Sequence, residues 1–93
     1  MPEMHFEVRW PDGGPMRCYS PSLVIKEWFA PGEHYPVADF LERARSAYRI
    51  ADARVRARWG WGCAHAASQL AAIELEAGRF APDALVRVER FEE

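Results

Sequence analysis

Cys63 is the residue of this 93-residue chain whose type and position most suggest chemistry. It follows two glycines, Gly60 and Gly62, and the small and apolar residues after it predict a helix that begins at Cys63. Unpaired amides and the dipole at a helix N-terminus favour a thiolate and attract anions. The position therefore suggests a nucleophile or an anion site, although a free cysteine is more commonly a small buried apolar residue.

The second thiol, Cys18, stands at the end of a predicted hairpin, just before another helix start. If it comes near Cys63, two thiols and two helix N-termini converge. We therefore predict a ligand-binding concavity between the hairpin end and the helical turn, where Ser20 caps the first helix and Trp61 forms an apolar wall. The residues expected to gather there are Cys18, Tyr19, Ser20, Ser22, Trp61 and Cys63. Two cysteines are too few for a disulfide framework, so both are expected to be free.

Metal and triad chemistry have weaker support. Cys63 and His65 are two positions apart on a predicted helix, so their side chains point roughly 200° apart, and the paired close spacings of zinc sites are missing. Cys63, His65 and Asp12 can be assembled on paper into a triad, but none lies in a nucleophile elbow or a glycine-rich phosphate loop. We expect no metal and no cofactor, and Cys63 is the one catalytic candidate.

These residues must be positioned by a long helix over residues 37–59. Its apolar side chains recur at steps of three and four, as on one buried helix face: Val37, Phe40, Leu41, Ala44, Tyr48, Ala51, Val55 and Trp59. Gly60 follows where a left-handed residue ends a helix. A third helix over residues 63–77 carries the apolar series Ala66, Leu70, Ile73 and Ala77. Its small residues predict close packing in an antiparallel helical hairpin.

The rest of the chain predicts strands and one short helix. Residues 4–10 alternate as a half-buried strand, residues 11–15 form a turn, and residues 16–19 return as a second strand. Ser20 is expected to cap a short helix that ends at Phe29, and residues 33–35 form a loop. Residues 85–91 predict a final strand beside the first. The prediction is a single α+β domain over residues 1–93, in the order β-β-α-α-α-β.

Charge and hydropathy bear on the possible partners. The net charge is −2, and no run approaches the roughly 20 apolar residues of a membrane span. The N-terminus lacks the features of a signal peptide, so we expect a cytoplasmic protein. Six arginines flank the apolar face of the long helix, where they cover core residues or bind nucleic acid. Asp39, Glu42 and Asp52 on the same helix argue against nucleic acid.

The opposite side of the long helix is unusually apolar. Ser46, Ile50, Ala53 and Ala57 lie there, whereas a helix facing water would more often be charged. Either the third helix or a second copy of the chain covers this side. We predict an oligomer contact, with a dimer preferred.

Several short strings together resemble a small bacterial family of nitrogen-starvation response proteins, usually encoded beside a nitrilase: Met1-Pro2-Glu3-Met4, Arg9-Trp10-Pro11-Asp12-Gly13, Cys18-Tyr19-Ser20-Pro21-Ser22, the turn from Gly60 to Cys63, Gln69-Leu70 and Ile73-Glu74. The sequence departs from the family pattern at Trp59, Trp61 and Ala64. The resemblance implies a cytosolic protein linked to nitrogen or nitrile metabolism. It implies no reaction and no catalytic residues.

The preferred hypothesis is a non-enzymatic accessory protein that acts by binding, either as a homo-oligomer or on an enzyme of the same pathway. The alternative is a small enzyme or carrier that uses Cys63 as a thiol nucleophile. A third, less favoured hypothesis is an arginine-dependent nucleic-acid binder.

Overall fold

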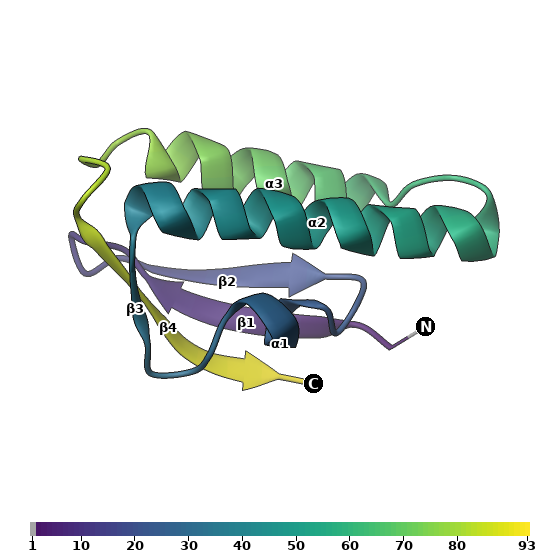
Figure 1. Cartoon of the computed structure of the whole chain (residues 1–93), viewed down its shortest axis with the longest axis horizontal. Helices are drawn as coiled ribbons and strands as arrows, with labels where there is room; N and C mark the ends of the chain where they lie inside the picture. The colour runs from purple at the N-terminus through teal and green to yellow at the C-terminus, as the bar shows by residue number, and fades with distance from the viewer. Residues whose placement is uncertain (1) are drawn as a thin grey trace.

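The computed structural model describes residues 2–93 as one antiparallel sheet with helices over one face (Figure 1). The strands are β1 (Met4–Arg9), β2 (Pro15–Ser20), β3 (His34–Pro36) and β4 (Leu85–Glu92), in the spatial order β2-β1-β4-β3. The helices are α1 (Ile25–Trp28), α2 (Val37–Trp59) and α3 (Ala64–Ala77). The predicted α+β class, the hairpin and the final strand beside the first are confirmed.

The core lies between the sheet and the helices. The alternation predicted for β1 is confirmed, because Met4, Phe6 and Val8 are buried. Val86 and Val88 of β4 extend this apolar surface, and the buried side of α2 closes over it. Aromatic rings fill one part of the core, where Phe40 contacts Trp10 edge-on at 5.5 Å and Phe29 at 5.0 Å between ring centroids.

The helical hairpin is longer than the sheet that it covers. At 23 residues, α2 is about 34 Å long, whereas a six-residue strand such as β1 spans about 20 Å. The closed end of the hairpin, residues 56–65, therefore extends beyond the strands (Figure 1), and we call it the overhang. Gly60 ends α2 there at φ +84°, as predicted. The prediction that Trp59 is buried is wrong: its side chain is 51% exposed because no strand lies beneath it.

Two further boundaries differ from the predictions. Residues 33–35, predicted as a loop, contribute to β3, which pairs antiparallel with β4. The first helix begins at Ile25, so the expected cap at Ser20 is wrong. The Ser20 hydroxyl instead donates to the Ser22 carbonyl at 2.7 Å and accepts from the Ser22 amide at 3.3 Å, which builds a turn.

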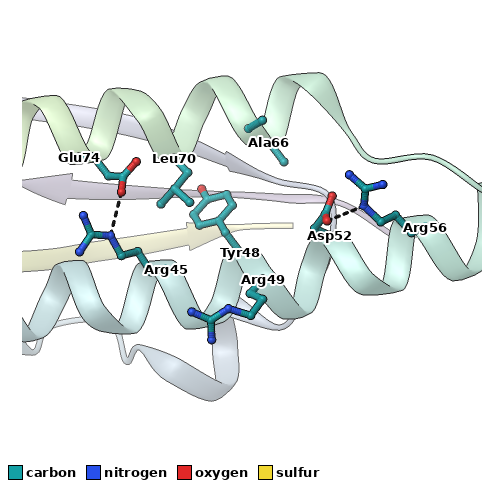
Figure 2. Close-up of a pocket in the computed structure, with 9 residues that line it drawn as sticks. Arg45, Tyr48, Arg49, Asp52, Arg56, Ala66, Leu70 and Glu74 are labelled. Atoms are coloured by element: carbon teal, nitrogen blue, oxygen red, sulfur yellow. Dashed lines mark hydrogen bonds and ion pairs between the residues drawn. The ribbon is translucent and has the colours of Figure 1, made fainter.

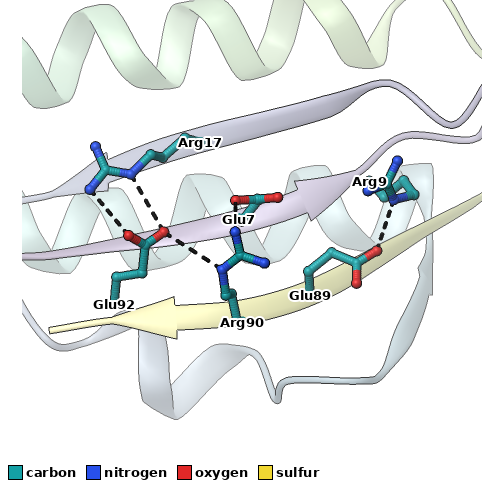
Figure 3. A network of polar contacts seen from close by, with 6 residues as sticks. All are labelled: Glu7, Arg9, Arg17, Glu89, Arg90 and Glu92. Atoms are coloured by element: carbon teal, nitrogen blue, oxygen red, sulfur yellow. Dashed lines mark hydrogen bonds and ion pairs between the residues drawn. The ribbon is translucent and has the colours of Figure 1, made fainter.

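The outer face of the sheet is covered by charged side chains in cross-strand pairs (Figure 3). Arg90 of β4 contacts Glu7 of β1 at 2.7 Å, Arg17 of β2 contacts Glu92 at 3.3 Å, and Arg9 contacts Glu89 at 3.1 Å. These pairs leave a polar, solvated face opposite the core. Within residues 2–93, no helix combines the length and apolarity needed to cross a bilayer.

Candidate functional site

A cavity of about 290 Å³ lies at the base of the overhang. Strand β2 and the turn after it supply Tyr19 and Pro21, and the end of α2 supplies Val55 and Trp59. Trp61, Gly62 and Cys63 close it from the turn, and Glu3 borders it from the segment before β1. Of the six residues predicted to gather in this concavity, Tyr19, Trp61 and Cys63 do line it.

Cys18 does not reach the cavity. It is adjacent to Tyr19 on β2 and therefore points to the opposite face of the strand, into the core, where it is completely buried. Burial raises the pKa of the Cys18 thiol to about 12. Both cysteines are free. The convergence of two thiols is therefore absent, and Cys63 is the thiol of the cavity.

Ser20 and Ser22 are also buried away from the cavity, in the turn between β2 and α1. The Ser22 hydroxyl accepts from the Val24 amide at 3.2 Å and from Arg54 Nη1 at 2.9 Å. Both hydroxyls thus hold the turn, and the Ser22 hydroxyl also fastens it to α2 through Arg54. Their role is structural support for Pro21, which borders the cavity.

Tyr19 is held in the site by contacts of both its side chain and its backbone. Its ring stacks on His65 of α3, with centroids 4.0 Å apart and planes 3° from parallel, and its hydroxyl donates to Glu3 at 3.0 Å. Its backbone amide donates to Gln69 Oε1 at 3.1 Å, and its carbonyl accepts from the Tyr48 hydroxyl at 2.6 Å. Burial, then the neighbouring Glu3 and then Cys63 raise the pKa of Tyr19, so its phenol is a hydrogen-bond donor at neutral pH. These bonds satisfy polar groups along the free edge of β2.

Cys63 occupies the N-cap position of α3 with an extended backbone, and its side chain is half-buried. The triad of Cys63, His65 and Asp12 is not assembled, because Asp12 lies at the other end of α3. Its carboxylate is 3.6 Å from Arg79, which follows the C-terminus of that helix. His65 stacks on Tyr19. Among residues 2–93, no three histidine, cysteine, aspartate or glutamate side chains are grouped as metal ligands.

The indoles beside the cavity are unusually exposed. Trp61 is 69% exposed and Trp59 is 51% exposed, and the guanidinium of Arg58 lies 5.2 Å from the Trp59 ring centroid. In the part of the chain that the structure describes, every arginine and lysine except Arg49 and Arg58 lies within 4.0 Å of a carboxylate oxygen. The overhang therefore combines apolar area with a cation that has no acidic partner.

The predicted oligomer surface is partly covered within one copy. Ala53 and Ala57 are exposed, whereas Ser46 and Ile50 are half-buried, and Ile50 packs against the core. This leaves a narrow uncharged strip on the outer side of α2.

Sequence reasoning missed five of the cavity residues: Glu3, Pro21, Val55, Trp59 and Gly62. The helical period predicts Trp59 in the core, although a second tryptophan two positions later, between two glycines, indicates an exposed aromatic turn. Glu3 and Pro21 carry no local signal, because their place in the cavity depends on the paths of β1 and β2.

Comparisons with curated proteins and with solved structures found no significant match. The family model described as nitrogen starvation-induced protein NitG matches residues 5–91, which include every strand and helix except the first residue of β1 and the last of β4. The match agrees with the resemblance seen in the short sequence strings. The chain therefore belongs to the NitG family of nitrogen starvation-induced proteins.

Proposed function

We propose that this protein is a non-enzymatic accessory protein of nitrogen or nitrile metabolism that binds a partner enzyme through the overhang. The observation that carries the proposal is the exposure of Trp59 and Trp61, which both line the overhang cavity. Exposed apolar patches on small proteins mark interaction sites, and tryptophan and arginine are the residues that most often dominate binding energy.

The apolar area is sufficient to support specific binding. A tryptophan side chain buries roughly 150–250 Å², and each Å² of apolar surface is worth about 25 cal/mol. With exposures of 51% and 69%, the two indoles together offer on the order of 5 kcal/mol before the costs of association are subtracted. An apolar side chain of the partner would enter the cavity that the two indoles line.

The charges favour a different protein over a second copy as the occupant. In a two-fold dimer the same patch meets itself, which would bring Arg58 of both copies together, while the one acidic residue of the cavity lining, Glu3, already accepts a hydrogen bond from Tyr19. A partner that places carboxylates around its apolar side chain would pair with Arg58. We therefore propose an acidic docking surface on the partner enzyme.

A capture experiment with a matched control tests the proposal. The tagged protein and two variants, Trp59→Ala/Trp61→Ala and Leu75→Ala, are used as bait in extracts of nitrogen-starved cells of the native host. Leu75 is 79% exposed but lies near the opposite end of α3, so its variant removes exposed apolar area elsewhere.

We expect wild type and Leu75→Ala to capture the same protein and the double tryptophan variant to lose it. With the purified partner, the affinity of the double variant should be at least about 100-fold weaker than that of wild type. Adding Arg58→Glu to the double variant should weaken the affinity further, because the new carboxylate repels the acidic partner. Capture of the same proteins by all three baits would contradict the proposal.

The second candidate function is thiol chemistry at Cys63, favoured by the position of this residue in the cavity wall at the start of α3. Here the thiol adds to an electrophilic carbon such as that of a nitrile, and the thiol proton passes to the nitrile nitrogen. Cys63→Ser separates the two candidates. An accessory protein keeps its partner when Cys63 is replaced, whereas a thiol enzyme loses turnover of the nitrile.

Self-association through the outer side of α2 stays a prediction. A second copy would cover Ala53 and Ala57, and Ala53→Glu/Ala57→Glu should then convert a dimer to a monomer. Light scattering coupled to size exclusion measures the molar mass in solution. A monomeric wild type at high micromolar concentration would contradict the prediction.

A further inference from the structure

A second cavity of about 400 Å³ runs between α2 and α3 (Figure 2) and shares no lining residue with the overhang cavity. Its apolar surface comes from Tyr48, Ala66 and Leu70, and Arg45, Arg49 and Arg56 line it from the α2 side. The Tyr48 hydroxyl is already bonded to the Tyr19 carbonyl, so this residue offers its ring. We call this cavity the interhelix groove.

Two ion pairs mark the ends of the groove. Arg45 Nε donates to Glu74 Oε2 at 2.8 Å, which joins the two helices, and Arg56 Nε donates to Asp52 Oδ2 at 2.7 Å (Figure 2). Each pair uses the Nε–H of its arginine. A guanidinium carries five N–H donors, so the terminal N–H groups of both arginines remain available to a ligand.

Arg49 lies between these pairs and has no carboxylate within 4.0 Å among residues 2–93. Three guanidinium groups and two carboxylates give the groove a net charge of about +1. A single uncompensated guanidinium matches a planar carboxylate, which it can bind through two parallel hydrogen bonds.

The turn after α2 passes close to one end of the groove. A Cβ atom at Gly62 would lie 2.6 Å from Asp52 Oδ1 and 2.9 Å from Arg56 Nη2, so the backbone of the turn passes close to the charged ends of this ion pair.

We propose that the interhelix groove binds a small organic monocarboxylate, with its carboxylate on Arg49 and its apolar body against Leu70 and the Tyr48 ring. An inorganic anion would leave the apolar wall unused, and a neutral apolar compound would leave the arginine unpaired. The volume of about 400 Å³ is within the range of roughly 300–1,000 Å³ seen for small-molecule sites.

The test uses 2-naphthoate and its uncharged analogue 2-naphthamide, which share size and shape. Both are titrated into the ¹⁵N-labelled full chain at pH 7 and low salt, and binding is followed by amide and arginine Nε shifts in NMR spectra. Arg49→Gln is compared with Arg58→Gln, which removes the other unpaired arginine of α2 but does not line the groove. The spectrum of each variant also shows whether it is folded.

We expect naphthoate to shift the Ala66, Leu70 and Arg49 signals and to bind at least about tenfold more tightly than naphthamide. Arg49→Gln should reduce the naphthoate affinity about tenfold, and Arg58→Gln should leave it unchanged. Equal affinities for acid and amide would overturn the proposal. So would equal effects of the two variants, shifts confined to the overhang indoles, or no groove shifts at millimolar naphthoate.

Discussion

The outer face of the sheet and the overhang are both open to solvent, yet they differ in how their side chains are partnered. On the sheet, Glu7 and Arg90 pair across the neighbouring strands β1 and β4, and Arg17 of β2 reaches across β1 to Glu92 of β4 (Figure 3). On the overhang, Trp59 and Trp61 are exposed and Arg58 has no carboxylate within 4.0 Å in residues 2–93. Exposure alone therefore does not identify a binding surface. The proposed binding surface rests on the groups that have no partner within residues 2–93.

The difference has a geometric origin. Strand pairing fixes which residues face one another, so Glu7 is opposite Arg90 and His5 is opposite Glu92, and charges can pair within one chain. The overhang extends beyond the sheet and has no strand to supply partners. Its free groups are available to a second molecule.

Thiol reactivity gives the largest expected contrast between the overhang and the body of the protein. With iodoacetamide at pH 8, Cys63 should be alkylated at least about 100-fold faster than Cys18, because Cys18 is fully buried and burial raises its pKa to about 12. Mass spectrometry of peptides from the folded protein measures both rates. Cys63→Ser is the control, since it should leave a folded chain with almost no labelling. Comparable rates at the two positions would show that Cys18 is not confined to the core.

Removing a hydroxyl from the body should cost more stability than removing one beside the cavity. Tyr48→Phe deletes the bond from a buried side chain to the Tyr19 carbonyl at 2.6 Å, so the free energy of unfolding should fall by about 1–2 kcal/mol. Tyr19→Phe deletes an exposed bond to Glu3 and should cost about 0.5 kcal/mol or less. Urea titration gives both values, and the reverse order would contradict the assignment of Tyr48 as the anchor of the β2 edge.

The charged sheet face should contribute little to either stability or binding. Arg90→Gln breaks the pair with Glu7, and since the Arg90 side chain is 61% exposed the free energy of unfolding should fall by about 0.2–1 kcal/mol. The effect should shrink further in 1 M salt. Partner capture by this variant should equal that of wild type, and a loss of capture would move the binding surface from the overhang to the sheet.

The smallest effect concerns acid stability. Arg17, which hydrogen-bonds Glu92, holds the pKa of that carboxyl below its usual value in the folded chain. As the pH falls below about 5, the unfolded state takes up this proton first. Stability conferred by Glu92 is therefore complete at neutral pH and is lost as the pH falls through the folded pKa. Glu92→Gln should flatten the acid side of a pH profile of urea midpoints slightly, and a steeper acid side would contradict this sign.

The sequence predicted the long elements of the fold well because their patterns reflect burial on one face. The bounds of α2 follow from its apolar periodicity and from Gly60, and those of β1 from strict alternation. Strand β3 was missed because His34, Tyr35 and Pro36 are too few to show a period and include a proline. Its pairing with β4 depends on contacts distant in sequence.

The candidate site was predictable in part. The turn predicts the places of Trp61 and Cys63 correctly, whereas alternation along β2 puts Cys18 and Tyr19 on opposite faces of the strand, so only one of them can face the cavity. Trp59 continued the helical period and was therefore assigned to the core. Periodicity cannot reveal that the sheet ends before the helix does, which is the reason this side chain is exposed.

Mapping the contact surface in the complex tests the central claim most directly. The labelled protein is bound to its captured partner, and cross-saturation NMR identifies the amide and indole N–H groups that receive magnetisation from the partner. We predict that the indole signals of Trp59 and Trp61 and the amides of residues 56–63 lose the most intensity. Strong losses on Arg17 and Arg90 of the sheet face, with unchanged indole signals, would contradict the assignment of the overhang as the binding surface.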